Sequence, residues 1–288
     1  MACENKMKSV KVVAELPNLK AVPSNYSVDH HHNSSPAIDS IDDSLPVVDF
    51  SLLSSEDPHQ HSKAIQDLGR ACEQWGFFMV VNHGIAESLM KELIGVANEF
   101  FLMPEEDKWR YKGQQVFDPI KYGTSFNYTS KETTFYWRDY LKLSVHPDFH
   151  SPHQPKNFRE LIWEYCEKCR KVTKMLLSGI SESLGLEEEL MRKSLDLDSG
   201  FEIFTNGKYK SVLHRAVVKK VPRISIGIAN CPAMNATVRP AASPLIQNER
   251  LPPLYLPMKY SEYVEKQQTK PLDGKSSLDQ IKIKLKQT

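Results

Sequence analysis

Three residues in the C-terminal third of the chain have the types and the spacing to hold a metal ion and a small carboxylate. Asn206-Gly207 separates two β-prone runs, which predicts a tight hairpin because both turn positions need a positive φ. His214 lies on the second run, and Arg223 and Ser225 share a face of the next run by the two-residue period of a strand. An imidazole ligates iron, zinc or copper, and an arginine fork with a hydroxyl grips a carboxylate. The pattern therefore predicts one wall of a metal and carboxylate site.

A structural interpretation of the same residues stays open, since a histidine on a strand near an arginine is common in proteins without a metal. His146-Pro147-Asp148 is the one His-x-Asp in the chain, but its proline resists strand pairing and the stretch is predicted to be a loop. Cys166 and Cys169 are neighbours on a predicted helix, which favours two ordinary thiols over a zinc or redox site. His83, in an Asn-His-Gly turn, is interpreted as structural.

The overall composition is that of a soluble globular protein. The 288 residues are 40% hydrophobic and 25% charged, enough for one large or two small domains with a sizeable core. A net charge of +1 gives no electrostatic reason to expect a nucleic acid or membrane partner. The first residues lack the apolar region of a signal peptide, and five scattered cysteines fit a reducing compartment, so we expect a cytoplasmic protein.

Hydrophobic periodicity predicts the elements that position the candidate site. A flexible arm covers residues 1–44, which are rich in Ser, Asn, Asp and His. Helices are expected at 58–75, 86–102, 155–184, 187–195 and 260–268. Strands are expected at 45–50, 77–81 and 135–141, followed by the hairpin over 202–218 and a return strand over 223–228.

Several stretches, in order along the chain, carry the residue pattern of one enzyme family. They are Leu45-Pro46-Val47-Val48-Asp49-Phe50, Trp75-Gly76-Phe77-Phe78, Val81-Asn82-His83-Gly84, Tyr122-Gly123-Thr124-Ser125-Phe126, Trp137-Arg138-Asp139-Tyr140-Leu141, the run from Asn206 to Arg215, and Leu272-Asp273-Gly274-Lys275-Ser276. From Leu45 to about Ile283 the chain resembles the plant non-haem Fe(II)/2-oxoglutarate-dependent oxygenases, which include flavanone hydroxylases and flavonol synthases.

The resemblance implies an α+β fold, a double-stranded β-helix (jelly roll) with flanking helices. It also implies Fe(II) and 2-oxoglutarate as cofactors, with ascorbate in support. His214 would be the distal iron ligand, while Arg223 and Ser225 would hold the far carboxylate of 2-oxoglutarate. The family reaction is hydroxylation or desaturation of small aromatic, flavonoid-like metabolites, and the expected partner is such a small molecule for a monomeric enzyme.

The chain departs from the family pattern where the other two iron ligands are expected. The family supplies them as His-x-Asp on strands before the hairpin, but here the sequence passes directly from Gly200 to Phe201. By ordinary strand and loop lengths, roughly 50–60 residues are missing, so we expect an incomplete barrel without several central strands. The loop between His214 and Arg223 is also one residue shorter than usual, which would reverse a strand face unless a bulge absorbs it.

These observations divide the chain into an arm at 1–44, an N-terminal dioxygenase region at 45–150, and a long helix with a truncated jelly-roll remnant at 151–288. Since two of three iron ligands are absent, no catalytic residue is assigned. We therefore expect an oxygenase that is impaired or inactive as written. A non-catalytic binding or regulatory remnant, and a truncated product of a skipped exon or faulty gene model, are the alternatives.

Overall fold

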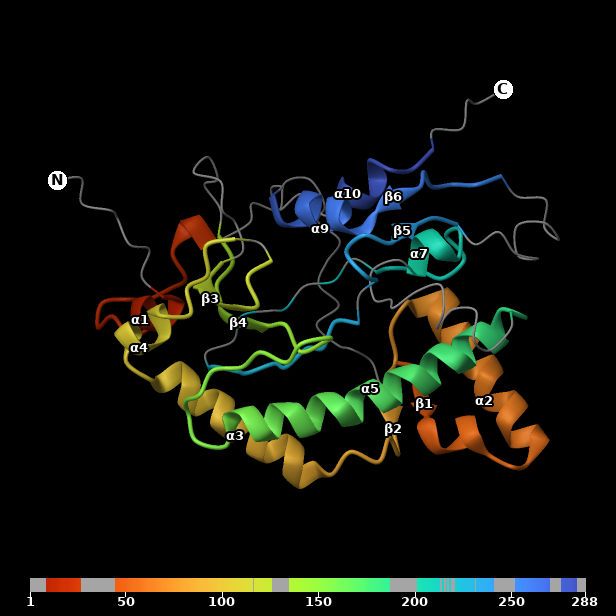
Figure 1. The fold of residues 1–288 in the computed structure, drawn as a ribbon, viewed down its shortest axis with the longest axis horizontal. Helices are drawn as coiled ribbons and strands as arrows, with labels where there is room; N and C mark the ends of the chain where they lie inside the picture. Colours follow the sequence, from red (N-terminus) through yellow and green to blue (C-terminus); the bar gives the residue numbers. More distant parts are fainter. Residues whose placement is uncertain are drawn as a thin grey trace.

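The computed structural model describes most of the chain. It covers residues 9–26, 45–115, 117–125, 135–186, 201–212, 214, 216, 218, 221–230, 232–240, 252–269 and 276–283. Figure 1 shows the long helix α5 (Phe158–Ser183) running along the molecule, with α2 (Pro58–Arg70) and α3 (Glu87–Leu102) on the same side. The C-terminal helices α9 (Tyr260–Thr269) and α10 (Ser276–Asp279) lie on the opposite side of the molecule.

The helix α2 begins where the sequence predicts, because Asp57 caps it and a proline follows. The carboxylate of Asp57 accepts the backbone N–H of His59 at 2.9 Å, and Pro58 occupies the first helical turn. The helix continues as a π-helical turn, η3 (Ala71–Trp75), which ends at Gly76 with φ 72°. Its apolar stripe packs against the C-terminal half of α5. This first core comprises Val48, Leu53, Ala64, Ile65, Leu68, Cys72, Ile180, Leu184, Leu186, Phe204 and Tyr209.

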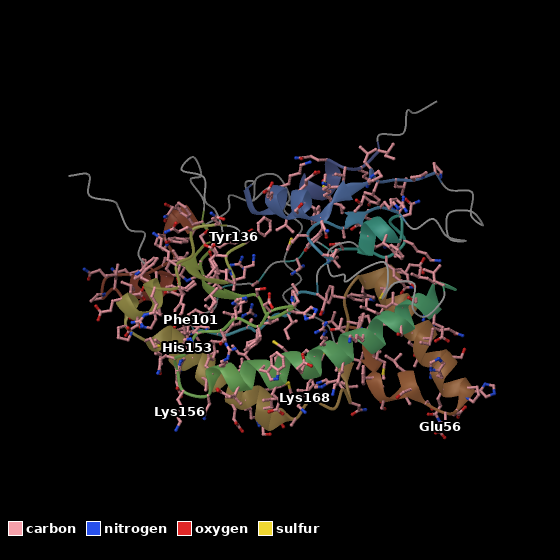
Figure 2. The ribbon with its side chains drawn as sticks, in the orientation of Figure 1. Glu56, Phe101, Tyr136, His153, Lys156 and Lys168 are labelled. Atoms are coloured by element: carbon pink, nitrogen blue, oxygen red, sulfur yellow. The ribbon has the colours of Figure 1, made fainter. Side chains whose placement is uncertain are left out.

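A second core lies between α3 and the N-terminal half of α5. The rings of Phe100 and Phe158 stack with centroids 5.7 Å apart, and Tyr122 meets Phe100 edge to face at 6.0 Å. In Figure 2, Phe101 and Tyr136 lie at this end of the molecule, and Glu56 lies at the other end beside α2. The buried members of the second core are Leu93, Ala97, Phe100, Tyr122, Phe158 and Ile162.

The strands of the described residues form three separate two-stranded sheets. β1 (Val47–Asp49) pairs in parallel with β2 (Met79–Val81), and β3 (Ile120–Thr124) pairs antiparallel with β4 (Asp139–Leu143). A third pair joins β5 (Thr237–Val238) to β6 (Met258–Lys259). No closed barrel forms within these ranges. This arrangement agrees with the expected jelly roll that has lost central strands.

The predicted hairpin over 202–218 is wrong. Residues Phe201–Phe204 form the short helix α7, and no strand occurs in the described residues from 211 to 230. Asn206 and Gly207 do have positive φ, 52° and 83°, as the turn signal requires. Local sequence therefore determined the turn, while strand formation depended on ladder partners that the described chain does not provide.

The helix α7 connects the first core to a third, C-terminal core. Phe204 packs into the first core, whereas its neighbour Ile203 packs into the third. Beside α7, the third core is built from β5, α9, α10 and the segment around Tyr255. Its buried members are Ile203, Val238, Tyr255, Tyr260, Val264, Leu278 and Ile281.

Part of the predicted flexible arm is structured. Residues 9–26 contain α1 (Val10–Ala14) and a 3-10 turn, η1 (Ser24–Tyr26). The carboxylate of Asp139 accepts the backbone N–H groups of Val10 and Lys11 at 2.8 and 2.9 Å, which satisfies two free donors of the first helical turn. At the other end of the segment, the ring of Tyr26 meets that of Trp137 edge to face at 4.8 Å. The arm prediction is therefore wrong for 9–26.

The helix expected at 187–195 lies outside the described residues. The strand expected at 135–141 begins later, as β4 at Asp139. Within the described ranges, no helix is both long and apolar enough to cross a bilayer.

Candidate functional site

The predicted iron ligand His214 is on the surface. Its Nδ1 lies 3.2 Å from the backbone carbonyl oxygen of Val212, two residues earlier, and the residue is exposed. A neutral ring that donates through Nδ1 would leave Nε2 free, which is the form that a metal ligand needs. His214 therefore offers a metal ion one nitrogen ligand, and it does so on the exposed surface.

The predicted carboxylate clamp is also exposed. Neither Arg223 nor Ser225 makes a side-chain hydrogen bond or an ion pair with the described part of the chain, and no strand ladder aligns them with His214. Ile224, between them, packs against the second core. Its two neighbours, Arg223 and Ser225, are exposed. The roles of Arg223, Ser225 and His214 stay predictions.

The other histidines singled out in the sequence have local partners. His146 lies in a loop, as predicted, and both of its ring nitrogens face the Arg170 guanidinium, at 2.9 and 2.8 Å. A cation placed against both nitrogens opposes a metal ion there. The Nδ1 of His83 accepts the backbone N–H of Ile85 at 3.1 Å and so stabilises the turn after β2. These contacts favour structural roles for both histidines.

The two helical thiols are partly buried and are not activated. Burial is the largest effect on Cys166 and raises its pKa to about 11, and it also raises the pKa of Cys169. A reactive or metal-binding cysteine needs the opposite shift, toward the thiolate. The interpretation of this pair as ordinary helix residues is therefore the better one.

The segment that carries the family motif instead serves as a structural connector. Glu202 accepts the Ser211 backbone N–H at 2.9 Å and the Tyr255 hydroxyl at 3.0 Å. The side chain of Asn206 accepts from the Leu254 backbone N–H at 2.7 Å and donates to the Pro252 carbonyl at 3.1 Å. The sequence carried no signal for these contacts, because the partners of Asn206 lie 46 and 48 residues further along the chain.

The described residues do not fit the iron that the family uses. Across those ranges, no three His, Cys, Asp or Glu side chains gather closely enough to hold a metal ion. The family centre needs two histidines and a carboxylate on one face of the metal. His214 offers a single ligand, so no catalytic step through iron can be derived for this chain.

A pocket of about 400 Å³ lies away from the predicted site residues. It is formed between the end of α3, the helix α4 (Glu105–Trp109) and the loop before α5. None of His214, Arg223 and Ser225 lines it. Its lining is formed by Glu99, Met103, Asp107, Arg110, Tyr111, Gln154 and Pro155. The pocket and the predicted site residues are therefore separate features.

The fold defines the class of protein. The structure superposes on a crystal structure of JOX2 in complex with 2OG, Fe and JA with a TM-score of 0.74, at 23% identity, covering 96% of this chain and 98% of that one. A putative 2OG-Fe(II) oxygenase from Caulobacter crescentus gives a TM-score of 0.60, at 16% identity, covering 78% of this chain and 98% of that one. The class is therefore the jelly-roll fold of the 2-oxoglutarate/Fe(II) oxygenases.

Sequence comparison gives the family. Residues 45–163 match the model of the non-haem dioxygenase in morphine synthesis N-terminal family. The chain is 31% identical to 2-oxoglutarate-dependent dioxygenase 19 of Oryza sativa subsp. japonica, covering 83% of this chain and 90% of that protein. It is 30% identical to flavanone 3-dioxygenase 2 of the same organism, covering 82% and 86%. The chain belongs to the plant 2-oxoglutarate- and Fe(II)-dependent dioxygenases.

The match with 2-oxoglutarate-dependent dioxygenase 19 is longer than this chain. It extends over 307 positions, more than the 288 residues of this chain. Since 83% of 288 residues is about 239, about 68 of the matched positions have no residue of this chain opposite them. 2-oxoglutarate-dependent dioxygenase 19 therefore contains residues that this chain lacks.

Proposed function

We propose that this chain derives from an oxygenase that hydroxylates or desaturates small aromatic, flavonoid-like plant metabolites, and that it is impaired in that reaction as it stands. The substrate class is supported by the 30% identity to a flavanone 3-dioxygenase over 82% of the chain. The family co-substrate is 2-oxoglutarate, for which Arg223 and Ser225 are the proposed clamp. We infer a cytoplasmic enzyme because five scattered cysteines fit a reducing compartment, and a net charge of +1 gives no electrostatic reason to expect a nucleic acid or membrane partner.

The observation that carries the proposed impairment is the surroundings of His214. This residue is exposed, its Nδ1 faces a carbonyl of its own segment, and no second and third metal ligand gather with it in the described ranges. One imidazole supplies one of the three ligands of the family centre. Iron affinity should therefore fall far below that of an intact relative.

We place the missing ligands at the junction of Gly200 and Phe201. The sequence there passes from a predicted helix to the motif segment, and the match with about 68 unpaired positions supports a gap of that order. A few strands with their turns occupy a similar length. Sequencing the transcript across this junction separates a shortened protein from a faulty gene model.

A chimera tests the proposal directly. The segment that 2-oxoglutarate-dependent dioxygenase 19 carries at this position is inserted between Gly200 and Phe201, and Fe(II)-dependent conversion of 2-oxoglutarate to succinate is measured. We expect turnover in the chimera and none in the parent chain. The matched control is the same chimera with the inserted His-x-Asp changed to Ala-x-Ala, which should be inactive. Turnover in the parent chain at the level of the chimera would refute the impairment.

A non-catalytic binding or regulatory protein is the second candidate, and the three buried cores favour it. They pack helices and short sheets without a closed barrel in the described residues. A chain of this kind should unfold cooperatively when purified, yet show no metal-dependent turnover. Gradual, non-cooperative unfolding would contradict this second candidate.

A further inference from the structure

The seven residues from Arg223 to Ala229 form a run whose backbone groups make no hydrogen bond within the described residues. None of its residues has a positive φ, and none belongs to a helix or strand. Arg223, Ser225, Ile226, Gly227 and Ala229 are exposed. The run is therefore a largely exposed segment whose backbone donors and acceptors are available for strand pairing.

The run is held in place at both ends. Ile224 packs against the second core, and the side chain of Asn230, just after the run, donates to the Thr173 hydroxyl on α5 at 3.1 Å. Chain that is already ordered loses less conformational entropy when it pairs. The anchoring therefore favours docking of another strand onto this run.

The residue pattern of the run is nearly symmetric about Ile226. In an antiparallel pair of two identical runs centred there, Ile224 lies opposite Ile228 and the two copies of Ile226 lie opposite each other. All the isoleucines then share one face and form a continuous cross-strand apolar row. On the other face, Ser225 lies opposite Gly227, and Arg223 lies opposite Ala229.

Charge selects the antiparallel arrangement over the parallel one. A parallel pair in register would place Arg223 directly against its own copy, which is destabilising. In the antiparallel pair the two copies of Arg223 are six residues apart along the strands, about 20 Å at the usual rise per residue. That separation exceeds the Debye length of about 8 Å at physiological salt, so their repulsion is screened.

We propose that two copies of this chain associate through Arg223–Ala229 as antiparallel strands, with Ile226 on the twofold axis. The contact is isologous, so it closes with two chains. The partner is a second copy because the run is complementary to itself in both apolar pattern and charge. In this proposal a dimer takes the place of the monomer that the family resemblance implies, and the inference does not depend on the proposed enzymatic function.

Another exposed apolar surface supplies the control. Val47 and Met79 face each other across β1 and β2 and are 54% and 53% exposed, more than the 38% of Ile226. Burial of apolar surface alone would therefore favour association through β1 and β2. Strand pairing favours association through the run around Ile226 instead. A lysine substituted at Met79 and another at Ile226 therefore distinguish the two modes of association.

The test is the mass of the full chain in solution, measured by sedimentation equilibrium. We expect the mass of two chains for the parent and for Met79→Lys, and the mass of one chain for Ile226→Lys and for Ile226→Glu alone. An equimolar mixture of Ile226→Lys and Ile226→Glu should regain the mass of two chains, because the two residues then lie opposite each other as a charge pair. Far-UV circular dichroism confirms that each variant is folded.

Several results would overturn the proposal. They are a parent chain that stays a single chain at every concentration, a dimer that survives Ile226→Lys, and a dimer lost in Met79→Lys. A mixture that fails to reassociate would exclude the twofold register. Assemblies larger than two chains would exclude the closed contact.

Discussion

The hydroxyl of Tyr209 lies 2.8 Å from the Oγ of Ser183, which joins the family motif to the last turn of α5. Tyr209 is buried, and its backbone N–H donates to the Thr205 hydroxyl at 3.1 Å. The next residue, Lys210, donates its backbone N–H to the Cys72 carbonyl at 3.2 Å. Tyr209, in the motif run from Asn206 to Arg215, therefore packs as part of the first core. The sequence had predicted a strand beside a metal site for this run.

We predict that Tyr209→Phe lowers the free energy of unfolding by about 1 kcal/mol, the usual net value of one hydrogen bond. The loss stays small because the Ser183 Oγ also bonds to the Ile180 carbonyl at 2.7 Å and keeps a partner. Urea denaturation measures the change. The matched control is Tyr111→Phe, since the Tyr111 hydroxyl has no hydrogen bond within the described residues, and it should change stability less. Equal losses in the two variants would contradict the account.

The same tyrosine predicts a loss of stability at alkaline pH. Burial is the largest effect on Tyr209 and raises its pKa from 10.0 to about 12. The folded state then holds this proton at a pH where the unfolded state releases it, so stability falls as the pH rises from about 10 to about 12. Denaturation at a series of pH values should show a smaller decline for Tyr209→Phe than for the parent. An unchanged pH dependence would mean that Tyr209 titrates alike in both states.

Cys72 should resist alkylation until the protein unfolds. Its side chain is buried in the first core, and desolvation raises its pKa to about 12, so the reactive thiolate is scarce at neutral pH. Iodoacetamide labelling followed by peptide mass spectrometry should find Cys72 unmodified in buffer and fully modified in denaturant. Rapid labelling in buffer would show that this core opens easily.

Asp139→Asn should release the N-terminal segment. The carboxylate holds the backbone N–H groups of Val10 and Lys11, and loss of its charge weakens both bonds. Trypsin should then cleave after Lys11 and Lys20 severalfold faster than in the parent chain. The matched control is Asp118→Asn, whose carboxylate also accepts two backbone N–H groups, those of Gln114 and Gln115. If both variants speed this cleavage equally, Asp139 is not the specific anchor.

The helices were predictable because their signals are local. Hydrophobic periodicity predicted a helix over 58–75, and the structure shows α2 at Pro58–Arg70, continued to Trp75 by η3. The long helix α5 likewise has its start near Pro155 and its end before Gly185, as expected. Such signals need no information about distant parts of the chain.

The motif segment was not predictable because its outcome depends on distant partners. The positive φ of Asn206 and Gly207 follows from local chemistry and is confirmed. Whether the flanking residues pair as strands depends on a sheet built from other segments, and here Ile203 and Phe204 instead pack as a helix between two cores. For the same reason the relative positions of His214 and Arg223 could not be predicted from their spacing in the sequence.

The most direct test of the central claim is the formation of succinate from 2-oxoglutarate by the purified full chain, with and without added Fe(II). We expect no succinate above the iron-free background, and no change on His214→Ala. The chimera carrying the inserted segment serves as the active reference in the same assay. Stoichiometric succinate that requires Fe(II) in the parent chain, and that is lost in His214→Ala, would show that the chain is an active oxygenase.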